Sequence, residues 1–445
     1  MRLNLKRHLI AVLGAGAALA VAMAPAQAQG LIRDTEIEQL LNDYAQPLFK
    51  VAGLGGGRIA VRIVKSDSFN AFVLDGRNVF IHTGALQQAD TPNQVIGVIA
   101  HETGHITGGH MAALRARIAR DTTRILLARV LGIGVAIATG NPAAVAATDE
   151  LQMRSLLAER RNQESAADQA GLSFLNATRQ SGRGMLETFE RFAQQEYIGD
   201  QNKDPFVRSH PVATDRLGQL RDAVQKNQNF NNKDTPALQL RHDMMRAKLA
   251  GYLTRPQAVF NRYPTSDNSF PARYARAIAK FFQGGQNAVE AAVADIDGMI
   301  RDQPNNPYLH ELKGDFYKRA GRNKEAIVSL RQALKIAGDA NLIRVELAQA
   351  LLATNDQTVI EEASNLLRRS LVEDQNSTAY RALGDAQYRQ NKQPEAEASL
   401  AQAAYLEGDL KQAKNYAQRA KRGLGAGSPS AIKMDDIIAY KPPVE

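Results

Sequence analysis

The sequence predicts an α+β domain with a small sheet, followed by an all-α solenoid built from repeats. Two observations lead to this prediction. Short alternating segments typical of strands precede residue 90 and are followed at once by an apolar helix, whereas a helical pattern repeats beyond residue 239. The chain has 445 residues and no cysteine, so buried cores rather than disulfides must stabilise both parts.

The first 28 residues have the pattern of a secretory signal peptide. A basic start precedes an apolar run over residues 9–24, and Ala26-Gln27-Ala28 provides a small-x-small cleavage site. We therefore expect residues 1–28 to be removed and the mature chain to begin at Gln29. An uncleaved membrane anchor is the less favoured alternative, because the apolar run is short for a span. No cysteine follows the cleavage site, which excludes a bacterial lipid anchor.

The formal charge of +9 is spread along the chain. No basic run is interleaved with aromatic residues, so we expect no nucleic-acid partner. An acidic partner or peripheral contact with an anionic membrane surface stays open.

Residues 29–226 form the predicted α+β domain. The pattern indicates a helix at 36–51, a glycine-rich turn at 53–57, and strands at 58–64, 70–74 and 78–82. The Asp75-Gly76-Arg77 segment predicts a hairpin between the last two strands. An edge strand of such a sheet can pair with the backbone of an extended peptide.

The next predicted helix contains candidate metal-binding and catalytic residues. Thr91, Pro92 and Gln94 form a helix start, apolar residues occupy 95–100, and His101-Glu102-Thr103-Gly104-His105 follows. Residues i and i+4 share one helix face, so two imidazoles can bind one zinc ion while Glu102 serves as general base. This spacing favours a zincin-type catalytic domain of a zinc metalloendopeptidase. The alternative is a pair of histidines that bind no metal.

A catalytic zinc ion usually has three protein ligands and one open position. The position ten residues after His101 is Met111, and His110 would point to the opposite face if the helix continued, so His110 is rejected as a ligand and expected to cap or pack. Glu164 and Asp168 share a helix face among small residues. Glu164 could bind zinc, and Asp168 could hold a zinc-bound histidine in the right tautomer. The alternative is an exposed acidic face.

A second apolar segment, residues 125–138, is interrupted by Arg129 and continues weakly to residue 147. It is too short to span a bilayer. A helical hairpin packed on the domain is the favoured interpretation, and a lid that covers the site or touches the membrane is the alternative.

The C-terminal part is predicted to contain a linker at 227–238, repeats at 239–425 and a tail at 426–445. Four of five pattern positions recur at an offset of 70: Gly314, Tyr317, Ala326, Leu330 and Ala333 correspond to Gly384, Gln387, Ala396, Leu400 and Ala403. Two periods of about 35 residues are typical of tetratricopeptide repeats, which form curved surfaces that bind protein segments.

Together these features resemble the gluzincin peptidases that include HtpX and the CAAX prenyl proteases, and within them the BepA-like periplasmic metalloproteases. Further shared segments are Asn70-Ala71-Phe72, Thr83-Gly84-Ala85-Leu86 and Ser209-His210-Pro211. The resemblance implies one zinc ion bound by His101, His105 and Glu164, with Glu102 as the base. The chain lacks the several membrane spans of HtpX and the prenyl proteases, so prenylated substrates are not expected.

The resemblance also implies a location and a task. It implies a periplasmic enzyme that acts on unfolded or misassembled outer-membrane β-barrel proteins, or with their assembly machinery. The rival interpretation is a chaperone or scaffold whose peptidase is largely latent. His210 has three open roles: it stabilises the oxyanion, it is a reversible fourth zinc ligand, or it only precedes a helix.

Overall fold

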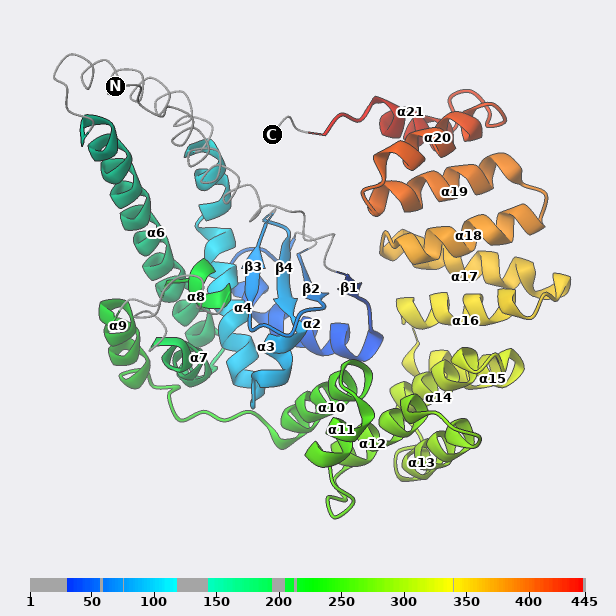
Figure 1. Ribbon diagram of the computed structural model, residues 1–445, viewed down its shortest axis with the longest axis horizontal. Helices are drawn as coiled ribbons and strands as arrows, with labels where there is room; N and C mark the ends of the chain where they lie inside the picture. The colour runs from blue at the N-terminus through cyan, green and yellow to red at the C-terminus, as the bar shows by residue number, and fades with distance from the viewer. Residues whose placement is uncertain are drawn as a thin grey trace, which may run out of the picture. The chain divides into compact units, whose positions relative to one another are not determined.

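The computed structural model describes residues 30–56, 59–74, 76–117, 143–193, 205–211, 214–338 and 340–442 (Figure 1). The predicted signal peptide and the apolar segment 125–138 lie outside these residues. The described chain divides into two compact units. The first contains the sheet and extends to Arg246, and the second contains residues 33–36 and the helices from Ala247 onward. The predicted linker and domain bounds stay predictions.

A four-stranded mixed sheet, in the order β1-β2-β4-β3, lies in the first unit. The strands are β1 (Leu31–Ile32), β2 (Ala60–Val64), β3 (Ala71–Val73) and β4 (Asn78–His82). β2 and β4 run parallel, whereas β3 and β4 form the antiparallel hairpin that the sequence predicted. β1 pairs antiparallel with β2. The sequence did not predict β1, because two residues are too few to show an alternating pattern.

One helix, α4 (Pro92–Thr107), lies at the centre of the first unit and contacts β3, β4, α6 and α7. The helix begins as the sequence predicted, since the Thr91 hydroxyl accepts a hydrogen bond from the backbone N–H of Gln94. The other helices there are α2 (Thr35–Val51), α3 (Thr83–Gln88), α6 (Ala143–Ala177), α7 (Arg183–Ala193), α8 (Pro205–Ser209), α9 (Thr214–Gln225) and the first part of α10 (Pro236–Leu253). The small mixed sheet with surrounding helices confirms the α+β prediction.

Glycines let α6 approach α4 backbone to backbone. A Cβ atom on Gly104 would lie 2.5 Å from the carbonyl oxygen of Ala167, and one on Gly171 would lie 3.0 Å from the backbone of Ala100. A larger side chain at either position would push the two helices apart. This close contact is what brings the α6 carboxylates to the α4 histidines.

The second unit is all-helical, and its helices follow one another as stacked neighbours (Figure 1). They are α11 (Pro256–Arg262), α12 (Phe270–Gln283), α13 (Ala288–Asp302), α14 (Pro307–Arg319), α15 (Asn323–Ala337), α16 (Asn341–Ala353), η5 (Gln357–Val359), α17 (Ile360–Glu373), α18 (Ser377–Arg389), α19 (Gln393–Leu406), α20 (Leu410–Lys421) and α21 (Pro429–Ala439).

The repeated sequence positions have equivalent surroundings in this unit. Gly314 of α14 packs against Leu330 of α15, and Gly384 of α18 packs in the same way against Leu400 of α19. In both hairpins the glycine leaves room for the leucine of the next helix. Among the described helices, none combines the length and the apolar character needed to cross a membrane.

Candidate metal centre

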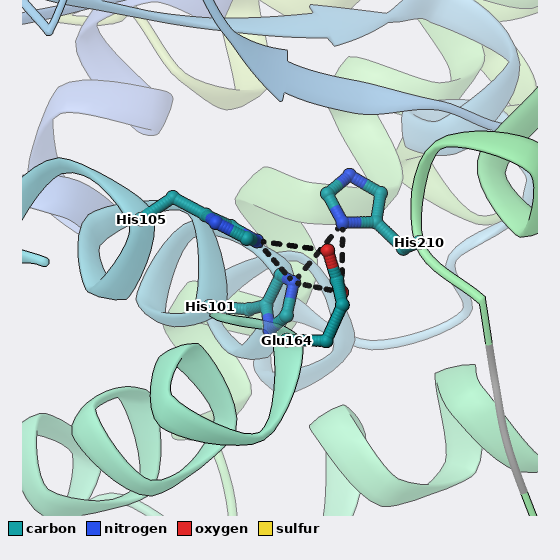
Figure 2. Close-up of side chains that lie close together, drawn as sticks. All are labelled: His101, His105, Glu164 and His210. Carbon is teal, nitrogen blue, oxygen red and sulfur yellow. Dashed lines mark hydrogen bonds and ion pairs between the residues drawn. The ribbon is translucent and has the colours of Figure 1, made fainter. Parts of the chain in front are cut away.

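Three segments far apart in the sequence bring four side chains to one point. His101 and His105 come from α4, Glu164 comes from α6, and His210 directly follows α8. Figure 2 shows the four side chains directed toward one another. One ligand atom from each lies within 4.8 Å of all the others. His101, Glu164 and His210 are buried and His105 is half-buried, so the cluster lies inside the unit.

Five of the separations among these four residues are close to the edge length of one tetrahedral metal site. His101 Nε2 lies 3.1 Å from His105 Nε2 and 3.2 Å from His210 Nδ1. The Glu164 carboxylate lies 3.4 Å from the Nε2 atoms of His101 and His105, and 3.2 Å from His210 Nδ1. A tetrahedron with metal–ligand bonds of about 2.0–2.1 Å has edges of roughly 3.3 Å. The residues present therefore fit a zinc-sized cation.

Asp168 lies behind His101, one helical turn after Glu164. Its Oδ1 is 2.9 Å from His101 Nδ1, so this carboxylate accepts a hydrogen bond when Nδ1 carries the proton. That tautomer leaves the Nε2 lone pair directed at the other three donors. The sequence prediction for Asp168 describes this same contact.

Arg216 of α9 is a member of the centre that the sequence analysis missed. Its guanidinium donates to both Asp168 oxygens, at 2.5 and 2.8 Å, and lies 3.2 Å from Glu164 Oε2. It also donates to the Pro211 carbonyl at 2.8 Å. A carboxylate that stays ionised when buried needs a cationic or hydrogen-bonding partner. The sequence could therefore indicate that Asp168 has a cationic partner, but not which of several arginines it is.

The charges in the centre depend on one another. Burial raises the pKa of Glu164, but His210 and His101 outweigh it and hold this pKa well below its ordinary value. Burial lowers the pKa of His101, but Asp168 and Glu164 outweigh it and raise the value to about 9. Burial and the nearby His101 lower the pKa of His105 to about 2. These shifts favour a neutral His105, and a metal ion at the site would compete with the proton on His101.

Glu102 lies beside the four donors, with its carboxylate almost fully buried. Its Oε1 has no hydrogen-bond partner in the described structure and lies 3.4 Å from His210 Nε2. Burial raises the pKa of Glu102, although His210 and His101 oppose this shift. A buried carboxylate oxygen without a partner, next to a cation site, is suited to accept a proton from water.

His110 differs from the sequence prediction in its direction. The periodicity argument assumed a continuing helix, but α4 ends at Thr107 and Gly109 adopts a positive φ of 61°. This break changes the direction in which His110 points, and its Nδ1 lies 2.9 Å from His105 Nδ1. His110 is not one of the four grouped donors.

Two imidazoles and a carboxylate from facing helices, with a second carboxylate beside them, are a donor set that metallopeptidases use. Residues 32–224 match the profile of peptidase family M48. The chain is 22% identical to the β-barrel assembly-enhancing protease of Escherichia coli K12, over 92% of this chain and 83% of the relative. Identity to the protein of that name from Yersinia pestis is 22%, over 92% and 84%. The metalloprotease LoiP of Escherichia coli K12 is 23% identical over 41% of this chain and 71% of its own length.

Proposed function

We propose that this protein is a zinc-dependent endopeptidase in which His101, His105 and Glu164 hold the ion and Glu102 is the general base. The observation that supports this proposal best is the group of four converging donors, close enough to share one zinc ion, beside a buried carboxylate oxygen that accepts no hydrogen bond in the described structure. Two imidazoles and one carboxylate, with Asp168 behind His101, are a typical donor set for catalytic zinc.

The side chains around the ion would divide the chemistry. When bound, zinc would polarise the scissile carbonyl and make a water molecule more acidic. Glu102 would take a proton from the attacking water and deliver it to the leaving amine. Asp168 would keep His101 in its metal-binding tautomer, and Arg216 would keep the Asp168 carboxylate ionised and oriented.

For His210 the geometry favours the role of a fourth ligand over the other two predicted roles. Its Nδ1 lies 3.2 Å from both His101 Nε2 and Glu164 Oε2, within the donor group. Its Nε2 lies 3.2 Å from the Ala71 carbonyl of β3, which orients the ring. In this arrangement His210 would occupy the position that the attacking water needs, so replacing it should raise peptidase activity.

We extend the proposal to a cellular task through the relatives. Two of them are named β-barrel assembly-enhancing proteases, and this chain covers more than four fifths of their length. We propose that this protein also acts in a Gram-negative periplasm, in the quality control and assembly of outer-membrane β-barrel proteins. The stacked helices of the second unit would be tetratricopeptide repeats that recruit substrates or assembly machinery.

The chemical proposal is tested with casein or a misfolded β-barrel protein as substrate. We expect cleavage by the wild-type protein, loss of cleavage with a chelator, recovery with zinc, and no cleavage by Glu102→Gln. Metal analysis should find about one zinc ion per chain in the wild type, and strongly reduced zinc in His101→Ala and Glu164→Ala. Cleavage that persists without zinc or in Glu102→Gln would refute the mechanism. A full zinc content in Glu164→Ala would refute the third ligand.

The position of His210 also favours a second candidate function, a chaperone or scaffold with a largely latent peptidase. A cell that lacks the gene separates the two. Glu102→Gln restores β-barrel assembly if the protein acts as a scaffold, and fails to restore it if proteolysis is required.

A further inference from the structure

We propose that His110 is a positioning residue for the metal centre, acting through His105 as Asp168 acts through His101. This inference rests on the proposed zinc site. It assigns a role to a histidine that helical periodicity had excluded from that side of the molecule.

The local backbone is built to bring the two rings together. α4 ends at Thr107, Gly108 caps it, and Gly109 with its positive φ interrupts the helix for two residues before residues 110–117 become helical again. The His110 ring lies directly over Gly108, where a Cβ atom would be 2.3 Å from Nε2 and 2.7 Å from Cε1 of that ring. Gly109 therefore provides the turn, and Gly108 provides the space for the imidazole.

The two nitrogens of His105 face different partners. Nε2 faces the donor group, 3.1 Å from His101 Nε2 and 3.4 Å from Glu164 Oε1. Nδ1 faces away from that group and lies 2.9 Å from His110 Nδ1, with the two rings at 79°. A hydrogen bond between two neutral imidazoles needs one donor and one acceptor. His105 must keep Nε2 free of a proton to bind an ion, so its Nδ1 is the donor and His110 Nδ1 is the acceptor.

The same arrangement occurs at the other histidine ligand, with one difference. His101 Nε2 also faces the donor group while its Nδ1 contacts an acceptor, the Asp168 carboxylate. Each histidine thus has a partner that fixes its tautomer and ring plane. The partner of His105 is the imidazole of His110 rather than a carboxylate. It therefore orients His105 without adding a negative charge like that of Asp168 to the centre.

The test compares three variants at fixed pH by zinc competition with a chromogenic chelator. His110→Leu keeps bulk but removes the acceptor, and we expect zinc to bind about 10–100-fold more weakly. His110→Asn places an amide oxygen near the position of Nδ1, and we expect it to restore affinity to within about threefold of wild type. Gly108→Ala keeps His110 but displaces its ring, so it should weaken zinc binding as much as His110→Leu does. Zinc affinity in the double variant Gly108→Ala with His110→Leu should be no lower than in either single variant.

Three further readouts separate this role from a purely structural one. The thermal midpoint of the metal-free protein should differ little between the Asn and Leu variants. The visible absorption of the cobalt-substituted protein should change in His110→Leu and return in His110→Asn. Wild-type affinity in His110→Leu, or Asn behaving no better than Leu, would overturn the inference. A wild-type protein that binds no zinc would instead refute the proposed function.

Discussion

Replacing Arg216 with methionine should destabilise the first unit far more than replacing Arg221, an arginine on the same helix. Both arginines pair with a carboxylate. The Arg216 and Asp168 side chains are 5% and 6% exposed, whereas Arg221 and Glu190 are 46% and 38% exposed. Breaking a buried pair leaves a charge that water cannot solvate, and typically costs about 3–5 kcal/mol of unfolding free energy. An exposed pair contributes roughly 0–1 kcal/mol.

A second substitution shows where that cost arises. In Arg216→Met the Asp168 carboxylate keeps the hydrogen bond from His101 but loses its bidentate partner. Asp168→Asn removes the negative charge that has lost its arginine and still offers an oxygen to His101. We therefore expect Arg216→Met with Asp168→Asn to be more stable than Arg216→Met alone, by about 1–2 kcal/mol.

The assay is urea denaturation of the full-length, metal-free protein, followed by far-ultraviolet circular dichroism because the chain contains no tryptophan. Hydrogen exchange of the α6 and α9 amides would show which transition belongs to the first unit. Equal costs for Arg216→Met and Arg221→Met would refute the reasoning. So would a double variant that loses the full sum of the two single effects.

The pattern around His101 could be predicted because its information is local. A capped helix with histidines at i and i+4 has one geometry, and the structure has that helix. Glu164 and Asp168 could be proposed as a pair for the same reason, since one turn of α6 separates them. That these carboxylates lie near His101 was indicated only by the small residues around them. In the structure Gly104 of α4 packs directly against Ala167 of α6, which allows this approach.

The remaining features depend on contacts that no local pattern contains. Arg216 reaches Asp168 from a different helix, and nothing in its own segment distinguishes it from the other arginines. His110 was misplaced because periodicity extended the helix beyond Thr107, where two glycines end it. A Gly-Gly pair after the last apolar turn was a stop signal in the sequence. Such a pair indicates the end of a helix, beyond which helical periodicity no longer gives the direction of a side chain.

Two further substitutions test packing and buried charge. Gly104→Ala should cost about 1–3 kcal/mol and weaken zinc binding, because its Cβ would meet the Ala167 carbonyl, whereas Gly218→Ala on α9 has open space and should be neutral or stabilising by urea denaturation. Glu311 of α14 is buried, and its Oε2 lies 3.9 Å from Lys248 without a hydrogen-bond partner in the described structure. Burial raises its pKa well above the ordinary value, even though Lys248 opposes this. A raised folded-state pKa means that stability is fully present below the ordinary pKa of the carboxyl and is lost as the pH rises through the folded value. Glu311→Gln should therefore be more stable than wild type by about 1–3 kcal/mol at pH 8, with the difference shrinking toward pH 4. If the glutamine variant is instead less stable at pH 8, attraction to Lys248 outweighs the cost of burying the charge, and the assigned cause is wrong.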